Sequence, residues 1–323
     1  MAHFLQEYWI ENSRQLLEPG QTVFLAGMKK EDGLVCTAIR EDDLAQSVPA
    51  LACSHEEADT RLLFHAKHAF NNGYETVIIH SPDTDVAVLC VANAAQFTGT
   101  LYFATGVNNN FRYIDMTKLS ADIGQLANIL PGLHALTGAD ATSGFAGIGK
   151  KTAVSMASSC IDLIQNLGES FSCTDETLLS AEKFIVSLYK KTRCEDTSIN
   201  CLRYSLFCKT QKRNTYLPPC QDTLQQHIRR ANYQAAIWAL CLDGCPDIPP
   251  PFQHGWNEDY EPVLMTQAAA PAVLQELTVC NCKSGCLKVC GCRKVDLACT
   301  PACGCSSDCN NVDETYDNSD YDE

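Results

Sequence analysis

The stretch Thr76-Val-Ile-Ile-His-Ser-Pro-Asp-Thr-Asp85 joins a short apolar run to a pair of acidic residues. An apolar run of this length, bounded by turn residues, is typical of the fully buried strands that parallel sheets use. Ligands of open parallel sheets bind beyond the carboxyl ends of the strands, so Asp83 and Asp85 are expected at that edge. The stretch therefore predicts a parallel sheet and also the place of a site.

Helix and strand patterns alternate on either side of this stretch. We expect strands over 21–27, 34–39 and 100–105 and helices over 56–70, 85–95 and 118–129. Ser54 and Glu57 have the spacing of a capping box at the start of the first helix. Helix and strand in alternation predict an α/β fold, a parallel sheet flanked by helices.

Beyond Gly149 the patterns become mostly helical, and the composition then changes twice. Helices are expected over 150–166, 174–191, 198–209 and 221–242. The prolines from Pro246 to Pro251 indicate a linker. The expected parts are an α/β domain (1–153), an α-helical extension (154–245), a Pro-containing linker (246–278), a cysteine-rich module (279–311) and an acidic disordered tail (312–323).

The composition bounds the class of protein. A chain of 323 residues with 46% hydrophobic residues is long enough for one large domain and a small module. It has no apolar run of membrane-spanning length and no signal-peptide pattern, so we expect an intracellular protein with no membrane partner. The net charge of −15 argues against non-specific binding of polyanions, but Lys183 to Arg230 carry ten basic residues against three acidic ones.

Five acidic residues stand where elements of the predicted fold begin or end. Glu57 and Asp59 open a helix, Asp83 and Asp85 follow a strand, and Asp140 follows the apolar run 130–136. Converging carboxylates repel one another unless a cation neutralises them, so the pattern suggests a site for two divalent metal ions. Asp residues at such junctions are also common as helix caps, and for each cluster alone that interpretation stays open.

At this point the motifs become specific: residues 54–153 resemble the C-terminal half of the flap endonuclease/XPG family, whose catalytic domain is PIN-like. The matching segments are Glu57-Ala58-Asp59, Pro82-Asp83-Thr84-Asp85, Thr137-Gly-Ala-Asp140 and Gly147-Ile-Gly149-Lys-Lys151. The resemblance implies Mg²⁺ or Mn²⁺ ligands at Glu57, Asp59, Asp83, Asp85 and Asp140, with Asp83, Asp85 and Asp140 catalytic. It also implies an endo- or exonuclease, a phosphodiester hydrolase selective for DNA structure.

Behind the last acidic residue lies a glycine-rich turn with two lysines. A turn such as Gly147-Ile-Gly149 lets backbone N–H groups approach a phosphate, and Lys150 and Lys151 add positive charge. We therefore expect Gly147, Gly149, Lys150 and Lys151 to contact the DNA backbone without reading bases. A simple helix cap remains the alternative interpretation of the two glycines.

The chain also departs from the family pattern. Family members begin with a strand that carries a metal-binding Asp, whereas neither 21–27 nor 34–39 contains an acidic residue. The Tyr that follows the last acidic residue in the family is Ala141 here. Two alternatives stay open: a nuclease, truncated and inactive or still active, or a domain that has become a binding scaffold.

The second motif concentrates cysteines near the C-terminus. Nine of the 20 cysteines lie in one short segment: Cys280, Cys282, Cys286, Cys290, Cys292, Cys299, Cys303, Cys305 and Cys309. So short a segment cannot build a sufficient apolar core, and in a reducing compartment metal rather than disulfides would fold it. Nine thiolates satisfy three tetrahedral zinc ions if three of them bridge.

The cysteine spacing resembles a tesmin-type CXC domain, a DNA-binding zinc module, although Val289 stands where DNA-binding members usually carry a Tyr. The order of the parts is similar to proteins derived from mobile elements (transposons). The sequence thus predicts a nuclear, divalent-metal-dependent nuclease-like protein that binds zinc and acts on DNA. The alternative is a non-catalytic nuclear protein that binds zinc and nucleic acid.

Overall fold

A computed structural model of the chain describes residues 2–30, 33–40, 45–210, 217–267, 280–283, 285–287, 289–294, 298–299, 303–305 and 309–311. The expected tail (312–323) and the second part of the expected linker (268–278) lie outside the described residues. In the described residues, no helix combines the length and the apolar character that crossing a membrane requires.

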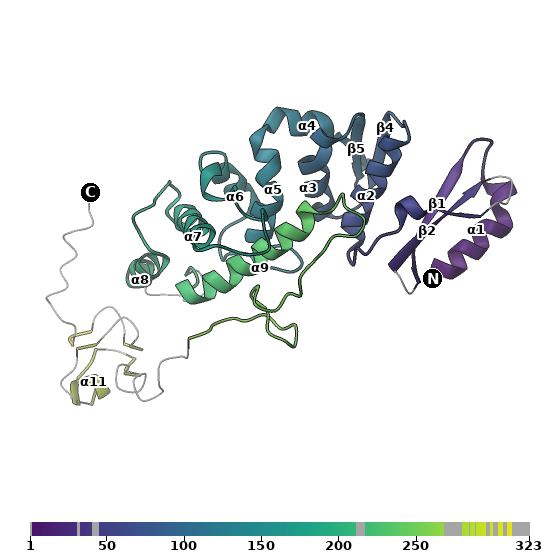
Figure 1. Ribbon diagram of the computed structural model, residues 1–323. Coiled ribbons are helices and arrows are strands. Elements are labelled where there is room, and N and C mark those ends of the chain that lie inside the picture. The colour runs from purple at the N-terminus through teal and green to yellow at the C-terminus, as the bar shows by residue number, and fades with distance from the viewer. Residues whose placement is uncertain are drawn as a thin grey trace.

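The N-terminal residues form a small antiparallel sheet with one helix. Helix α1 (Ala2–Leu16) precedes the strands β1 (Thr22–Lys30), β2 (Gly33–Arg40) and β3 (Gln46–Ser47), which lie in the order β1-β2-β3. The two expected N-terminal strands are present, but they pair with each other and do not join the sheet that follows. The expected α/β domain over 1–153 therefore holds two separate sheets, which Figure 1 shows lying apart.

The second sheet carries the stretch from which the fold was predicted. Its strands are β4 (Thr76–His80), β5 (Thr100–Thr105) and β6 (Arg112–Asp115), with β4 and β5 parallel and β6 antiparallel. The two expected strands are confirmed, but the sheet is mixed. The expected full burial of β4 is wrong, because β4 lies at the edge of the sheet, where Ile79 is buried and Ile78 is 54% exposed.

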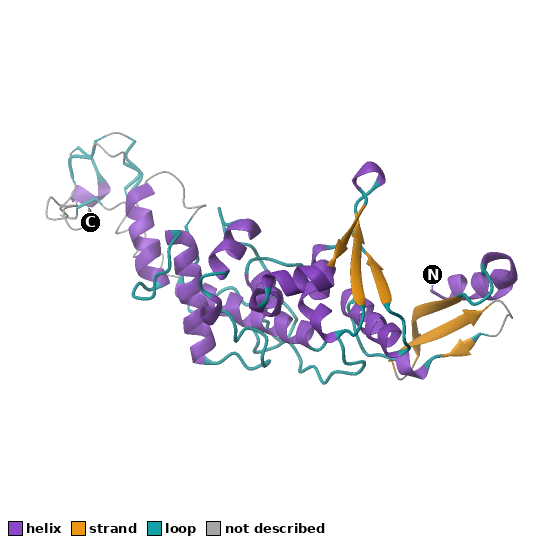
Figure 2. Ribbon diagram, turned by 90° about the horizontal axis from the view of Figure 1, so that it is seen from above, coloured by secondary structure: helices purple, strands orange, loops and turns teal. Residues whose placement is uncertain are grey.

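Helices pack against this sheet and continue beyond it (Figures 1 and 2). Helices α2 (Ala58–Asn71), α3 (Thr84–Asn93) and α4 (Met116–Ile123) contact the strands β4 and β5. The expected helix over 118–129 is two helices, because Gly124 adopts φ +55° between α4 and α5 (Gln125–Leu136). The fold is thus a mixed α/β fold with small sheets.

The start of α2 differs from the expected capping box. The helix begins at Ala58 with Glu57 as its N-cap residue, and no side chain caps it. The backbone N–H of Ser54 donates to the carbonyl of Gly244 instead. The Glu57 carboxylate accepts hydrogen bonds from helix α9, as described below. Tertiary contacts have therefore replaced the local cap.

The helical extension consists of α6 (Lys150–Ala157), α7 (Asp175–Lys190), α8 (Ile199–Thr210) and α9 (Gln221–Ala239). The expected helix over 150–166 ends early, at Ala157. Helix α9 is the main packing element, since it contacts both α5 and α7. Its residues Ile228, Ala231 and Ala235 are part of one apolar core that also includes residues of α2, α3 and α5.

The first part of the expected linker is docked on α9. The buried Arg230 guanidinium donates hydrogen bonds to the carbonyls of Gly255 (2.9 Å) and Val263 (2.7 Å). The Tyr233 hydroxyl donates to the carbonyl of Pro249 at 2.7 Å. The prolines of this segment and its lack of a helix or strand pattern suggested a tether. The three hydrogen bonds instead hold residues 246–263 against α9.

One close approach on α9 gives a stability prediction. Gly168 has φ +87°, and a Cβ placed there would lie 2.7 Å from the Cβ of Ala235. We expect Gly168→Ala to lower the free energy of unfolding by about 2 kcal/mol or more, because it adds backbone strain and a clash. Denaturant unfolding measures it.

Gly73→Ala is the matched control, because Gly73 has φ +86° and a Cβ added there would have no atom within 4 Å. This control adds strain without a clash. Equal losses in the two variants would contradict the tight packing of Gly168 on α9.

Candidate functional site

The five predicted acidic residues come together in one cavity. A cavity of about 250 Å³, here called the acid cavity, is lined by Glu57, Ala58, Asp59, Asp83, Asp85, Asp140, Ala141, Gln234 and Trp238. Its carboxylates come from three separate parts of the chain. The convergence that the sequence suggested is therefore present in the structure.

The starts of two helices and one loop place these carboxylates. Glu57 is the N-cap residue of α2, and Asp59 lies in the first turn of that helix. Asp83 is the N-cap of α3, where its carboxylate accepts a hydrogen bond from the backbone N–H of Asp85 at 2.9 Å. Asp140 lies in the loop after α5. Helix N-termini favour nearby negative charge, so α2 and α3 partly offset the repulsion between the acids.

The pKa of Asp59 responds to its burial and to the neighbouring carboxylates. Burial first, and then the negative charges of Asp83, Glu57, Asp85 and Asp140, together raise the pKa of Asp59 to about 6. The protonated form is favoured because burial, and after it each neighbouring carboxylate, disfavours the negative charge of Asp59. A cation in the cavity would reverse this preference.

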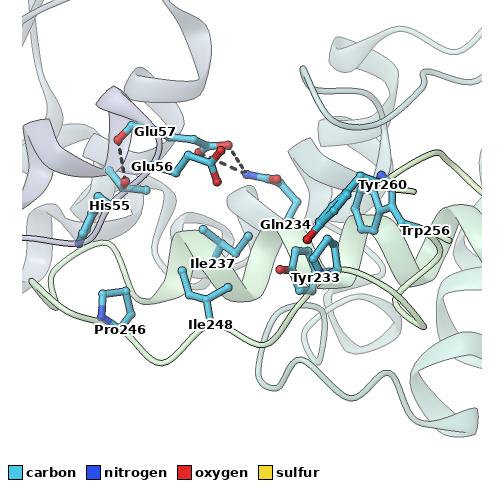
Figure 3. Close-up of a pocket in the computed structure, with 12 residues that line it drawn as sticks. His55, Glu56, Glu57, Tyr233, Gln234, Ile237, Pro246, Ile248, Trp256 and Tyr260 are labelled. Carbon is cyan, nitrogen blue, oxygen red and sulfur yellow. Dashed lines mark hydrogen bonds between the residues drawn. The ribbon is translucent and has the colours of Figure 1, made fainter. Parts of the chain in front are cut away.

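Two carboxylates have partners that the sequence interpretation missed. Asp85 is buried and lies 2.7 Å from His134 Nε2 of helix α5. Glu57 accepts hydrogen bonds from Gln234 Nε2 and from Trp238 Nε1, each at 3.2 Å (Figure 3 shows the contact with Gln234). Nothing local in the sequence marks His134, Gln234 or Trp238, because each reaches the cavity from a helix far along the chain.

The five carboxylates line one cavity, but no three of them have oxygen atoms that all lie within 4.8 Å of one another. In the part of the chain that the structure describes, the groups of three or more potential ligands whose ligand atoms all lie within 4.8 Å of one another consist of cysteines alone. The five carboxylates line the acid cavity at wider spacing. Oxygen ligands from Asp and Glu are those that hard divalent cations prefer, so the donor set fits Mg²⁺ or Mn²⁺ in chemistry.

The glycine turn and its lysines lie beside the acid cavity. Gly147 has φ +75°, and Gly149 is the N-cap of α6 with open space around it. Lys150 Nζ donates to the carbonyl of His134 at 2.7 Å, to Thr137 Oγ1 at 3.1 Å and to the carbonyl of Gly138. Lys150 therefore holds the loop before Asp140. Both Lys150 and Lys151 are exposed. DNA contact by these four residues stays a prediction.

Burial lowers the pKa of Lys150 to about 8, and the negative charge of Asp85 opposes this effect. The charged form is disfavoured because neighbouring protein atoms replace part of the water around the ammonium. The charge of Asp85 thus affects Lys150, but the hydrogen-bond partners of Lys150 Nζ are two carbonyls and one hydroxyl and not the carboxylates.

The N-terminal residues that the structure describes add no acid to this site. None of the described residues among 2–53 lines the acid cavity. The sheet β1-β2-β3 instead meets the rest of the chain near Cys53 and Ser54. Within the described residues, the site therefore rests on the five acids that the motifs identified.

The pKa of Asp59 gives a prediction about stability and pH. Because its pKa is raised in the folded chain, the protonated carboxyl stabilises the fold below about pH 4, and this contribution is lost as the pH rises through about 6. In buffer free of Mg²⁺ and Mn²⁺, we expect Asp59→Asn to be more stable than the wild type above about pH 6 by about 1 kcal/mol, since solvent screens part of the effect. Denaturant unfolding between about pH 4 and pH 7.5 measures the difference.

Asp122→Asn is the control, because Asp122 is exposed on α4 and lies outside the acid cavity. If the stability of Asp59→Asn changed with pH as that of the wild type does, the carboxylates would not lie as close as described.

The second candidate site is the cysteine module, Cys280 to Asn311. All nine of its cysteines are free thiols and seven of them are buried. Three overlapping groups of four could each hold a metal ion: Cys280, Cys290, Cys292 and Cys299; Cys280, Cys286, Cys299 and Cys305; Cys280, Cys282, Cys286 and Cys290. A thiolate that bridges two metal ions must belong to two such groups, and Cys280 is a member of more than one.

Hydrogen bonds to sulfur surround these groups. Asn311 Nδ2 donates to Cys299 Sγ at 3.3 Å, and the backbone N–H of Cys280 donates to Cys303 Sγ at 3.4 Å. A hydrogen bond from the backbone of Arg293 lowers the pKa of Cys290 to about 6. Donors of this kind stabilise thiolates, the form that binds metal. The module is thus a cysteine-rich cluster suited to bind metal ions.

No family model, no curated protein and no solved structure matches this chain. The two sites therefore rest on the residues and the geometry described above.

Proposed function

We propose that the protein is a divalent-metal-dependent phosphodiester hydrolase that acts on DNA. The observation that carries the proposal is the convergence of Glu57, Asp59, Asp83, Asp85 and Asp140 on one cavity. Carboxylates gathered in this way repel one another, as the raised pKa of Asp59 indicates. A site that keeps such repulsion is typical of function rather than of stability.

Mg²⁺ or Mn²⁺ held by these five carboxylates would supply Lewis-acid activation of water and of the phosphate oxygens. The chain's own residues orient the ligands. His134 fixes the rotamer of Asp85, while Gln234 and Trp238 fix that of Glu57. Asp59 would hold a cation in its deprotonated form, because a carboxylate ligand must be deprotonated.

The cysteine module supports a nucleic-acid partner. With three zinc ions its nine thiolates would be saturated, as in the tesmin-type CXC modules that it resembles. Val289 and Leu287 project from the module, 79% and 65% exposed. Exposed apolar side chains on a small, metal-folded unit favour a contact surface. The assignment of DNA as a partner rests on the cysteine spacing and not on these two side chains.

Part of the predicted basic surface is engaged within the protein. Arg193 pairs with Asp162 and Glu195, and Arg230 is buried against the docked segment 246–263. The described lysines of this stretch that remain exposed, such as Lys191, offer positive charge on the surface. Salt-sensitive binding is expected where such residues meet phosphates.

One observation favours a second function, that of a non-catalytic protein that binds nucleic acid. No acid from the described residues among 2–53 reaches the acid cavity, so those residues hold no counterpart of the further carboxylate that the flap endonuclease pattern would bring. In that case DNA binding would depend on the basic residues and the zinc module. It would not change when the carboxylates are replaced.

Cleavage of DNA tests the proposal. The zinc-loaded protein is incubated with flap, nicked and single-stranded DNA, with and without Mg²⁺ or Mn²⁺, beside an Asp83→Asn/Asp85→Asn double variant. The proposal predicts cleavage by the wild type only when the cation is added. Cleavage no greater than that of the double variant, together with unchanged DNA binding, would establish the second function instead.

A further inference from the structure

A second cavity shares a wall with the acid cavity, and we propose that it binds an unpaired nucleobase of the DNA strand. The nucleotide concerned would be one next to the phosphate held at the carboxylates, a placement that rests on the proposed function. Binding of a base does not itself require cleavage. The two parts of the inference can therefore be tested separately.

This second cavity, here called the aromatic cavity, has a volume of about 430 Å³. Figure 3 shows its lining, which includes Tyr233 and Ile237 of helix α9 and Ile248, Trp256 and Tyr260 of the docked segment. Cavities of about 300–1,000 Å³ with mostly apolar and aromatic walls are typical of small-molecule sites. The size and lining suit a planar heterocycle.

The two cavities meet at two side chains. Glu57 and Gln234 line both, and the Gln234 amide donates to the Glu57 carboxylate at 3.2 Å between them. A group in the aromatic cavity is therefore separated from the carboxylates by one hydrogen-bonded pair. A nucleotide carries a base and a phosphate on one sugar, so it has two groups that could occupy two adjoining cavities.

The aromatic rings are held in different ways. Tyr233 is fixed by its hydrogen bond to the carbonyl of Pro249 and packs against Trp256, with ring centroids 5.4 Å apart and planes at 64°. Tyr260, in contrast, is 71% exposed and adopts φ +63°, an uncommon conformation for a residue other than glycine. The turn that Asn257 forms with Tyr260 and Glu261 holds this conformation. Tyr260 presents a ring on which a base could stack.

The polar groups of the aromatic cavity favour a base over a phosphate. The carboxylate of Glu56 lines it together with that of Glu57, so the cavity is acidic as well as aromatic. Phosphate would be repelled there, whereas the amino groups of adenine, cytosine and guanine donate hydrogen bonds that carboxylates accept. Thymine has no amino group. We therefore expect bases with an amino group to bind better than thymine.

A proline-rich peptide is the other occupant that aromatic walls could suit. The aromatic cavity adjoins the acid cavity at Glu57 and Gln234. This favours the nucleobase, because a proline-rich peptide has no phosphate to place at the carboxylates. The test below includes this peptide as an outcome.

The experiment measures the binding of labelled single-stranded oligonucleotides to the full-length, zinc-loaded protein by fluorescence anisotropy. Ca²⁺ replaces Mg²⁺ and Mn²⁺, so that a divalent cation can neutralise the carboxylates beside the phosphates of the strand. Probes of (dA)₆ and (dT)₆ are compared in the wild type, Tyr260→Ala and Tyr260→Phe. Tyr74→Ala is the matched control, since Tyr74 is 59% exposed and lines neither cavity.

We expect Tyr260→Ala to weaken binding of (dA)₆ by about 5- to 100-fold, the effect of losing one stacked base. Tyr260→Phe keeps the ring and should retain the affinity, and (dA)₆ should bind more tightly than (dT)₆. Equal affinities of the wild type and Tyr260→Ala would overturn the inference, as would binding of a proline-rich peptide that displaces no DNA.

Cleavage measured on the same preparations separates the two proposals. If the wild type cleaves and Tyr260→Ala binds DNA as the wild type does, the aromatic cavity is not a base site and the proposed function stands. If no cation supports cleavage but binding still depends on Tyr260, the base site stands and the proposed function is wrong.

Discussion

Removal of zinc with a strong chelator is expected to unfold the cysteine module and to leave the helices α2 to α9 folded. The module has few apolar side chains other than its cysteines, so metal must supply its folding energy. Structural zinc contributes on the order of 10–16 kcal/mol in small zinc-binding peptides. Hydrogen exchange measured by mass spectrometry should show that the amides of residues 280–311 lose protection, whereas those of α9 keep it.

Two cysteine variants sharpen this prediction. Cys292→Ser removes a thiolate from one group of potential ligands and should lower the zinc content of the purified protein. Cys201→Ser is the control, because Cys201 is an exposed free thiol outside the module. Protection that survives chelation, or disulfides found among the nine cysteines, would contradict a metal-folded module.

The double variant Asp83→Asn/Asp85→Asn is expected to lose DNA cleavage by more than about 100-fold, the upper end of the effect of losing a group that merely supports a metal ligand. Asn keeps the size of both side chains, and it retains the N-cap on α3 that Asp83 provides. The loss would thus reflect the missing charge rather than a disrupted helix. Cleavage rates at saturating Mg²⁺ and Mn²⁺ measure it.

The stability of this variant serves as its control. With two of the repelling carboxylates neutralised, the variant should unfold at a higher denaturant concentration than the wild type when neither cation is present. A variant that is both less stable and inactive would point to misfolding. Cleavage by a well-folded variant at the wild-type rate would contradict a role for Asp83 and Asp85.

The acid cavity could be predicted because the positions of its acidic residues follow local rules. Asp83 and Asp85 come after a strand, and Glu57 and Asp59 open a helix, so the pattern of elements alone brought them to one edge. The partners His134, Gln234 and Trp238 were not predictable in this way. They depend on how α5 and α9 pack, which no local pattern in the sequence encodes.

The fold was predicted less completely for a similar reason. The apolar composition of β4 indicated a buried strand, but its burial depends on what covers it, and β4 is at the edge of its sheet. The residues from Pro246 to Val263 had the pattern of a linker, because their hydrogen bonds to Arg230 and Tyr233 join positions distant in the sequence. The sequence predicted which segments form strands, but it did not predict which parts of the chain pack against them.

Binding of Mn²⁺ to the zinc-loaded protein tests the central claim most directly, because Mn²⁺ is paramagnetic and its free and bound forms differ in electron paramagnetic resonance. We predict that the wild type binds Mn²⁺ at the acid cavity, that Mg²⁺ competes for the same site, and that Asp83→Asn/Asp85→Asn loses this binding. Equal Mn²⁺ binding by the wild type and the double variant, or none by either, would contradict the assignment of the five carboxylates as a metal site.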